Sequence, residues 1–471
     1  MKNITKTLLV LVSSLSISFA AYAGGLELTG SAKASYSIGG TDDSFDKGIG
    51  ISNEMKVAAS GELDNGFTWN YHLDLDPGAS GALVQDDAAL TIGMGDMGTI
   101  GFFDGEGSLH SNLAWGIGTP IFSAFAEKYG DRKAITIGLL FYALGVFISS
   151  TATTPEAHQS LNILIGFGIA GSGFGPILAV VGRSASPEKR SLALGVTTAA
   201  GSAGQVVGPP IAAILLSSMP WSSVFIVFAI ISLLTIILVP LLKSNSKIAK
   251  NKIEENLSDA LINAVKDPTY IMLFLGFFSC GFQLAFITAH FPAFIAEASS
   301  PIIKGTLISL VCNSVESLGA LSMALIGFFN IIGSVGAGAL GKNFTKKYLL
   351  SIIYIGRTIA AILFILLPIT PLSVAIFSMV MGALWLATVP LTSGIIGYIY
   401  GLKFMGTLYG IVFLSHQIGS FVGVWLGGIF YDIYGSYDIV WWVGIGVGAF
   451  SAIIHLPVKE MPLTERKLKL A

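Results

Sequence analysis

The chain has 471 residues, of which 53% are hydrophobic and 11% are charged, and its formal net charge is −2. A soluble domain is about 25% charged. The composition therefore excludes an ordinary soluble protein and predicts an integral membrane protein. The two cysteines, Cys280 and Cys312, show no metal-binding or redox spacing, and we interpret them as packing residues in or beside apolar segments.

The first 23 residues have the three parts of an export signal. Lys2 and Lys6 form a basic start, an apolar run follows, and Ala21-Tyr22-Ala23 fits a small-x-small cleavage site. We therefore expect a signal peptide over residues 1–23. An uncleaved membrane anchor is the alternative.

Residues 24–108 differ sharply from the rest of the chain. They contain 14 acidic and 3 basic residues and no apolar run of spanning length. Polar and apolar residues alternate, and turn sequences such as Asp64-Asn65-Gly66 separate the alternating runs. Alternating segments of about ten residues joined by tight turns are typical of outer-membrane β-barrels. We expect an antiparallel β segment of about four to six strands, fewer than the roughly eight that close a barrel.

From residue 109 onward the chain consists of long apolar segments bounded by Pro, Gly or charge. An apolar helix needs about 20 residues to cross a bilayer. We expect eleven spans, which cover roughly residues 109–126, 133–150, 159–181, 192–217, 220–242, 269–297, 317–340, 348–368, 371–400, 405–431 and 437–457. The expected fold class is therefore an all-α membrane protein with about 11 transmembrane helices, preceded by the short β segment.

Lysine and arginine residues are concentrated in every second connection between these spans. The basic connections include residues 243–268, the longest polar one, and the C-terminal tail, whereas the other connections carry only Lys304. Basic connections stay on the cytoplasmic side of a membrane. The pattern predicts a multi-pass protein of a bacterial inner membrane, and anionic lipid explains the basic loops without nucleic acid.

Two segments that follow the first and the seventh predicted span resemble each other. Residues 123–133 align with residues 338–347, and the first copy is similar to the loop signature Gly-x-Leu-Ala-Asp-Arg-x-Gly-Arg-Lys of the major facilitator superfamily. Glu127 stands for the Asp of that signature, while Ser123 and Asp131 depart from it. Two related halves are the plan of these transporters.

A second motif supports the same resemblance. Gly204-Gln205-Val206-Val207-Gly208-Pro209 is similar to the superfamily's fifth-helix Gly-x-x-x-Gly-Pro motif, and residues 329–341 and 413–442 resemble its monocarboxylate-type and oxalate–formate-type porters. The resemblance covers about residues 109–460. It implies a gating role for the motif residues Glu127, Lys128, Gly130, Arg132, Lys133, Gly204, Gly208 and Pro209. Charges that only fix the topology are the alternative for the loop residues.

The N-terminal segment resembles a different family. Residues 1–107 are similar to the start of an alphaproteobacterial porin, which makes the chain chimeric, and no helix 1 of the transporter family precedes residue 109. The resemblances imply five parts: a signal peptide (1–23), a porin-like β segment (24–108), an N-terminal transporter half with helices 2–6 (109–242), a cytoplasmic linker (243–268) and a C-terminal half with helices 7–12 (269–471). A small periplasmic β domain is the alternative for residues 24–108.

Polar residues inside membrane spans are costly and often functional. Arg357 is the only basic residue well inside a predicted span, and its forked guanidinium suits a carboxylate. Pairing with backbone carbonyls or reaching toward the cytoplasmic surface are the alternatives. The other candidate substrate-binding residues are uncharged amides and imidazoles, which serve equally well as partners between helices: Gln283, His290, Asn330, His416 and Gln417. His290 or His416 could also titrate.

The sequence contains no nucleotide loop, metal-ligand cluster or nucleophile motif, so we expect no cofactor, no metal and no enzymatic activity. We expect a secondary transporter of small organic anions such as monocarboxylates, with a proton or a counter-anion as co-substrate and membrane lipid as its surroundings. A non-functional porin–transporter chimera is the alternative. An outer-membrane channel is a weaker reading, because apolar helices stop in the inner membrane. The sequence does not indicate an oligomeric state.

Overall fold

The computed structural model describes residues 23–37, 48–62, 68–77, 83–93, 99–103, 109–152, 155–242, 256–300, 302, 308 and 315–470. The chain divides into two compact units, Met1–Gly107 and Ser108–Ala471. The predicted signal peptide up to residue 22, residues 243–255 of the predicted linker and Cys312 lie outside the described residues.

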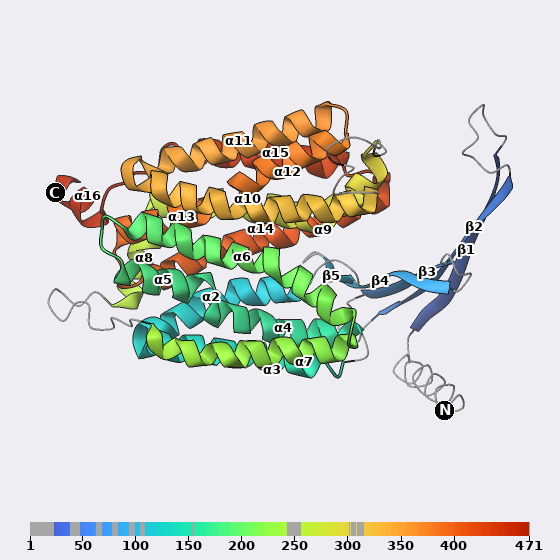
Figure 1. Ribbon diagram of the computed structural model, residues 1–471, viewed down its shortest axis with the longest axis horizontal. Helices are drawn as coiled ribbons and strands as arrows, with labels where there is room; N and C mark the ends of the chain where they lie inside the picture. The colour runs from blue at the N-terminus through green and yellow to red at the C-terminus, as the bar shows by residue number, and fades with distance from the viewer. Residues whose placement is uncertain are drawn as a thin grey trace. The chain divides into compact units, whose positions relative to one another are not determined.

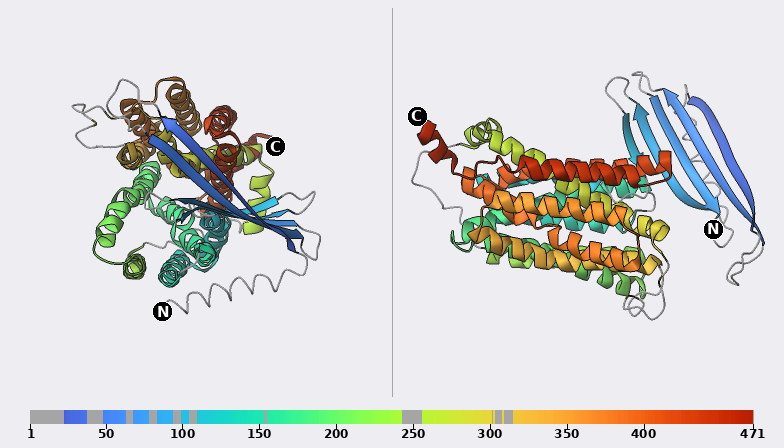
Figure 2. Two further views of the ribbon diagram at one scale, coloured as in Figure 1. Left: turned by 90° about the vertical axis from the view of Figure 1, so that its right-hand side faces the viewer. Right: turned by 90° about the horizontal axis from the view of Figure 1, so that it is seen from above.

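The first unit contains an antiparallel sheet whose strands follow one another in chain order, β1-β2-β3-β4-β5 (Figure 2). The strands are β1 (Ala23–Ser37), β2 (Gly48–Glu62), β3 (Thr68–Pro77), β4 (Leu83–Gly93) and β5 (Thr99–Phe103). Strands β2 and β3 flank Asp64-Asn65-Gly66 and pair from Glu62 with Thr68 onward. The resemblance of this segment to a porin stays a prediction.

The second unit is helical throughout its described elements, as its apolar segments predict, and its long helices lie side by side (Figure 1). Its first half has α2 (Leu109–Tyr129), α3 (Asp131–Ser149), α4 (Pro155–Ser172), α5 (Phe174–Ser184), α6 (Arg190–Leu216), α7 (Trp221–Thr235) and the 3-10 helix η2 (Ile236–Leu241). Its second half has α8 (Leu257–Val265), α9 (Pro268–Ala298), α10 (Val315–Asn343), α11 (Lys346–Leu366), α12 (Pro371–Leu384), α13 (Thr388–Tyr400), α14 (Met405–Tyr434), α15 (Asp438–Ile454) and α16 (Leu463–Leu470).

Every predicted span coincides with one of these helices or with a consecutive pair. Among the described residues, 8 helical segments are long and apolar enough to cross a membrane. The helix α15 is apolar but shorter, and α2 and α6 are not among the eight. The structure thus supports a multi-pass membrane bundle, and the number eleven stays a prediction.

The two halves of the bundle meet mainly through α2 with α14 and α6 with α10, and α5 and α6 of the first half also contact α14 and α13 of the second. The α6–α10 contact is close because it is formed by glycines. A Cβ atom on Gly195 would lie 2.9 Å from the Cα atom of Gly338, so any larger residue would push the helices apart. The backbones of α6 and α10 are therefore in direct contact. Small residues permit such close helix packing in membranes.

Candidate functional site

The centre of the second half is a break in a membrane-spanning segment, between α12 and α13. Pro390 has no N–H to bond the carbonyl four residues earlier, so a helix cannot continue undisturbed through residues 385–387. The N–H of Val389 bonds Leu386 O at 3.0 Å instead of the carbonyl of Trp385. The break leaves backbone groups that need other partners, because lipid cannot supply them.

Arg357 on α11 supplies partners for the freed carbonyls. Its Nε and Nη2 atoms donate to Leu384 O at 3.0 Å and 2.5 Å, and Nη2 also donates to Trp385 O. The side chain is fully buried, and its guanidinium lies 5.4 Å from the ring centre of Tyr354. Of the alternatives for Arg357, the structure shows the contact with backbone carbonyls, and it leaves Nη1 without a hydrogen bond among the described residues.

Asn330 on α10 contacts the same break from the opposite side. Its Oδ1 atom accepts from the N–H of Leu386 at 3.0 Å and from the Ser334 hydroxyl at 3.2 Å. Its Nδ2 atom donates to the hydroxyl of Ser202 on α6 at 2.9 Å. Asn330 therefore connects the broken helix to the other half of the protein.

A buried polar cluster lies next to Arg357. It contains Cys280 from α9, Tyr354 and Arg357 from α11, Thr388 from α13, and Tyr409 and His416 from α14. The thiol of Cys280 is 3.3 Å from Thr388 Oγ1 and 4.0 Å from Trp385 O. Arg357 Nη1, the hydroxyls of Tyr354 and Tyr409, and His416 Nε2 have no hydrogen-bond partner in the described part of the chain. Such atoms are costly unless a ligand or a movement supplies partners.

His416 and Gln417 form a chain of hydrogen bonds that crosses to the first half. His416 Nδ1 lies 2.8 Å from Gln417 Oε1, and Gln417 Nε2 donates to the carbonyl of Asn112 on α2 at 3.0 Å. The imidazole also stacks on Phe413, with 5.2 Å between ring centres.

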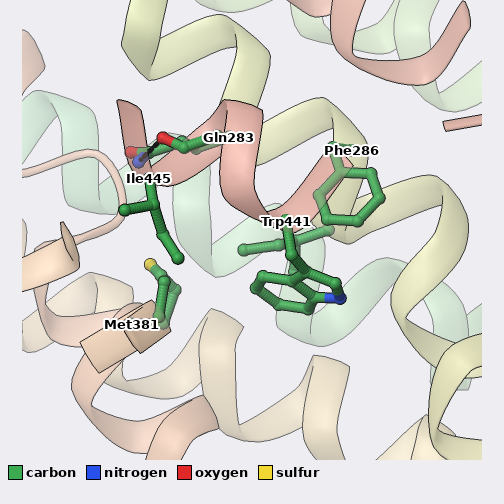
Figure 3. Close-up of a pocket in the computed structure, with 8 residues that line it drawn as sticks. Gln283, Phe286, Met381, Trp441 and Ile445 are labelled. Atoms are coloured by element: carbon green, nitrogen blue, oxygen red, sulfur yellow. Dashed lines mark hydrogen bonds between the residues drawn. The ribbon is translucent and has the colours of Figure 1, made fainter. Parts of the chain in front are cut away.

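Gln283 and His290 are separate from this cluster. Gln283 Nε2 donates to Gly444 O on α15 at 2.9 Å, and His290 Nε2 lies 3.0 Å from Val424 O on α14. Figure 3 shows Gln283 beside Ile445, with Met381 and Trp441 around the same small cavity. Its volume of about 10 Å³ suits no more than one water molecule, so this cavity does not hold an organic anion as it stands.

Glu127 joins the two halves at the end of the bundle that we predict to be cytoplasmic. Its carboxylate accepts from the backbone N–H of Thr407 at 3.1 Å and from the Thr407 hydroxyl, at the start of α14. A helix start favours a negative charge. Glu127 lies just beyond the predicted span 109–126, and burial raises the pKa of its carboxyl to about 7, although the Thr407 hydrogen bonds and Arg183 oppose that rise.

The other motif residues lie around this contact or apart from it. Arg132 donates to Leu242 O at 2.7 Å and so ties the start of α3 to the end of η2. Gly130 has φ 110°, which favours glycine, and permits the sharp turn between α2 and α3. Lys128 and Lys133 are exposed.

The two glycines of the fifth-helix motif meet no described neighbour, although Val206 between them approaches Gly327 of α10. A Cβ atom on Gly204 or Gly208 would meet no described atom within 4 Å. The side chain of Pro209 lies outside the described residues. The structure thus brings Glu127 into an interface but does not bring Gly204 or Gly208 into one.

The predicted substrate residues therefore form three groups rather than one. Arg357 and Asn330 hold the broken helix, His416 and Gln417 link α14 to α2, and Gln283 and His290 hold α9 to its neighbours. Three residues of the buried polar cluster were not among the candidates predicted from the sequence: Cys280, Tyr354 and Tyr409. Tyr354 could have been found, because it lies three residues before Arg357 on the same helical face.

Comparison with known proteins shows which family of proteins this chain resembles. A sequence model described as Major Facilitator Superfamily matches residues 107–393. The uncharacterized MFS-type transporter YcxA of Bacillus subtilis (strain 168) is 30% identical over 348 residues, which cover 70% of this chain and 80% of that protein. Monocarboxylate transporter 13 of Bos taurus is 22% identical over 326 residues, 68% of this chain and 72% of that protein.

A solved structure has the same fold. The Major Facilitator Superfamily transporter FucP in the outward conformation matches with a TM-score of 0.58 at 14% sequence identity. The match covers 74% of this chain and 88% of that chain. At this identity the likeness shows the fold alone.

Proposed function

Because the chain belongs to the Major Facilitator Superfamily, we propose that it is a secondary transporter of small organic anions, monocarboxylates among them, which works by alternating access between its two halves. The protein is a membrane transporter rather than an enzyme. We place it in the inner membrane of a bacterium, with residues 109–242 and 269–471 as its halves and residues 243–268 as their cytoplasmic linker.

The fully buried guanidinium of Arg357 is the observation that carries the anion proposal. A buried charge needs a partner of opposite charge or a full set of hydrogen bonds. Two of its nitrogens have carbonyl partners, but Nη1 has none among the described residues. A substrate carboxylate would supply the missing acceptor and the missing negative charge. The name of Monocarboxylate transporter 13, a relative, supports the same substrate class.

The contact of Glu127 with Thr407 supports alternating access. It closes the two halves against each other at one end, and α2 and α14 remain in contact as far as Asn112 and Gln417. In this arrangement the halves are closed at the Glu127 end. Transport then requires these bonds to break when the halves rock.

Uptake of labelled monocarboxylates into proteoliposomes tests this function. Arg357→Gln should abolish saturable uptake, because no cation remains to bind the carboxylate. Arg357→Lys should restore uptake only in part, because lysine keeps the charge but lacks the fork that Arg357 presents. Normal uptake by the glutamine variant, at equal protein amounts, would remove Arg357 from the substrate site.

A non-functional chimera is the second candidate, and the division of the chain supports it. The described residues of the unit Met1–Gly107 are β-strands, and the second unit, whose described elements are helical, begins at Ser108. If the segment before residue 109 replaces a helix that the transporter needs, the unmodified chain will insert but transport poorly. Replacing residues 1–108 by a family-like first helix should then restore uptake. Robust uptake by the unmodified chain would refute this candidate.

A further inference from the structure

We propose that Asp267 and Arg466 are positioning residues for the contact of Glu127 with Thr407, which we call the gate. Through these two residues the C-terminal tail (residues 459–470) holds the start of α14 in the place where Glu127 binds it. The inference rests on the proposed function, because it names what keeps one end of the transport pathway closed. It assigns a role in transport to a tail that the sequence indicated only as a basic cytoplasmic segment.

The first part of the tail connects the starts of two helices of the second half. The N–H of Lys459 donates to the hydroxyl of Thr269, in the first turn of α9, at 3.4 Å. The carboxylate of Glu460 accepts from the N–H of Lys347 at 3.1 Å and from the ammonium group of Lys346 at 3.4 Å. Both lysines lie in the first turn of α11, so the tail ties α9 to α11.

The ion pair of Arg466 with Asp267 extends this connection to a third helix. The two Nη atoms donate to the two carboxylate oxygens at 2.6 Å and 3.1 Å, a forked contact that fixes the geometry of both groups. The hydroxyl of Tyr400 on α13 also donates to Asp267, at 2.7 Å. Only 7% of the Asp267 side chain and 13% of the Arg466 side chain are exposed, so this pair differs from the surface pairs that contribute little.

The turn between α13 and α14 is the first link from this ion pair to the gate. Tyr400 is the last residue of α13, and α14 begins at Met405. Gly401 has φ 85°, a conformation that favours glycine, and it ends α13. Because only residues 401–404 separate the two helices, the bond of Tyr400 to Asp267 limits where α14 can begin.

The first turn of α9 is the second link. The hydroxyl of Tyr270 donates to Leu408 O at 2.7 Å, and Leu408 directly follows Thr407. The ring of Tyr270 also packs edge-on against Tyr400, with 5.5 Å between the ring centres. Asp267 caps this turn of α9, so its position determines the positions of both tyrosines. Thr407 is therefore held from both sides by groups that depend on Asp267.

The end of the tail is attached more by these polar bonds than by apolar packing. Figure 1 shows α16 at the same end of the bundle as α8. A cavity of about 220 Å³ lies between α8, the end of α13 and the tail, and its lining includes Asn263, Tyr400 and Leu463. Of the described leucines of α16, Leu463 is half-buried and Leu468 is 77% exposed. Loss of the ion pair therefore releases α16 without opening a hole in the core.

Distances between spin labels in the purified full-length chain test this role without any need for transport. One pair of labels, at Tyr129 on α2 and Lys403 before α14, spans the gate. A reference pair, at Leu367 and Tyr434, lies at the opposite end of the second half. All four positions are exposed. They are replaced by cysteine in a background in which both native cysteines are replaced by serine.

We expect Asp267→Asn and Arg466→Gln each to broaden the gate distances at one fixed pH. The ratio of closed to open gates should fall at least about threefold, because a hydrogen bond to a charged group contributes more than that factor. Arg466→Lys should keep part of the closed population, because lysine retains the charge without the fork. Glu465→Gln, at an exposed neighbour on α16, is the matched control and should change nothing.

The reference pair separates positioning of the gate from a merely structural role. Its distances should be the same in all of these variants. Gate distances that neither Asp267→Asn nor Arg466→Gln changes would overturn the proposal, and so would equal broadening of the reference pair, because the whole second half would then be loosened. If the chain takes up no anion but the gate distances depend on both residues, the proposed function falls and the positioning role stands. If uptake is saturable but neither substitution moves the gate, the role falls and the function stands.

Discussion

If the halves separate as we propose, the charge of Glu127 depends on whether they are closed. In the closed arrangement its carboxyl is buried against Thr407, and burial raises its pKa to about 7. When the halves separate, water returns and the pKa falls toward the 4.3 or so of an exposed glutamate. Between about pH 4.3 and about pH 7, the Glu127 carboxyl is therefore more protonated in the closed state than in the open state.

The sign of the pH dependence follows from this difference. The proton-linked stability of the closed contact is fully present below about pH 4.3 and is lost as the pH rises through about 7. We predict that acidification of the Glu127 side closes the contact, and that Glu127→Gln remains closed at pH 8. Spin-label distances between α2 and α14, measured from pH 5 to pH 8, check this. A wild-type distance that does not change with pH would contradict the prediction.

At the residue scale, the sequence indicated candidate residues but not the contacts that they make. Arg357 stood out because it is a charge in an apolar span, but its bonds to Leu384 and Trp385 depend on a break that only the fold brings next to it. Cys280 gave no signal, because Trp385 and Thr388, which lie beside its thiol, are more than a hundred residues away in the sequence.

The broken helix α12–α13 is the element on which the candidate site depends. Asn330 holds the N–H of Leu386 at the break and also bonds Ser202 across the interface between the halves. Because these two hydrogen bonds have different partners, two substitutions can measure their contributions to stability separately.

We predict that Asn330→Ala lowers stability by about 1–3 kcal/mol, because the buried N–H of Leu386 loses its acceptor. Ser202→Ala is the matched control. It removes the bond between the halves and the bond from the Ser202 hydroxyl to Thr198 O, but it leaves the N–H of Leu386 with its acceptor, so its effect on the thermal unfolding midpoint should be smaller. Thermal unfolding in detergent with a thiol-reactive or intrinsic fluorescence readout measures both. Equal effects of the two substitutions would show that the helix break does not need Asn330.

The helices themselves were predictable, because long apolar segments in lipid have few alternatives. The split of residues 371–400 into α12 and α13 was not predicted, although Pro390 in the middle of the span was a visible signal. The fifth-helix motif implied a gating role for Gly204 and Gly208, and a Cβ atom on either meets no described neighbour. The fifth-helix motif indicates the family of the chain. The contacts of its residues depend on which helices lie beside it.

Across the whole molecule, the C-terminal tail is tied to the start of the second half. Arg466 on α16 forms a two-pronged ion pair with Asp267, at 2.6 Å and 3.1 Å, and Tyr400 also donates to Asp267. Burial acts to raise the pKa of Asp267, but these hydrogen bonds outweigh it and hold the pKa below its usual value. The tail and the end of the predicted linker therefore lie at the same end of the bundle.

The distribution of basic residues predicts that this end is cytoplasmic. We expect cysteines introduced into residues 243–268 or into the tail to resist an impermeant thiol reagent in intact cells and to react after the cells are opened. A cysteine introduced into residues 369–370 is the matched control and should react in intact cells. Reaction of the linker from outside would reverse the topology.

The central claim is that the halves must separate where Glu127 meets α14. A Cβ atom on Gly406 would lie 3.2 Å from the Cβ atom of Ser123, slightly closer than the roughly 3.5–4.5 Å across a disulfide, so a small shift of α14 against α2 allows a disulfide between them. We therefore combine Ser123→Cys with Gly406→Cys in a Cys312→Ser background. Oxidation of this double variant locks the contact by a disulfide, and reduction releases it. Each single substitution is a control.

The decisive measurement is uptake of a labelled monocarboxylate into proteoliposomes by this double variant, before and after reduction. The account predicts that the oxidised protein takes up almost none, that reduction restores saturable uptake, and that the single variants do not respond to oxidation. Equal uptake by the oxidised and reduced double variant, with the disulfide verified, would contradict alternating access through this contact.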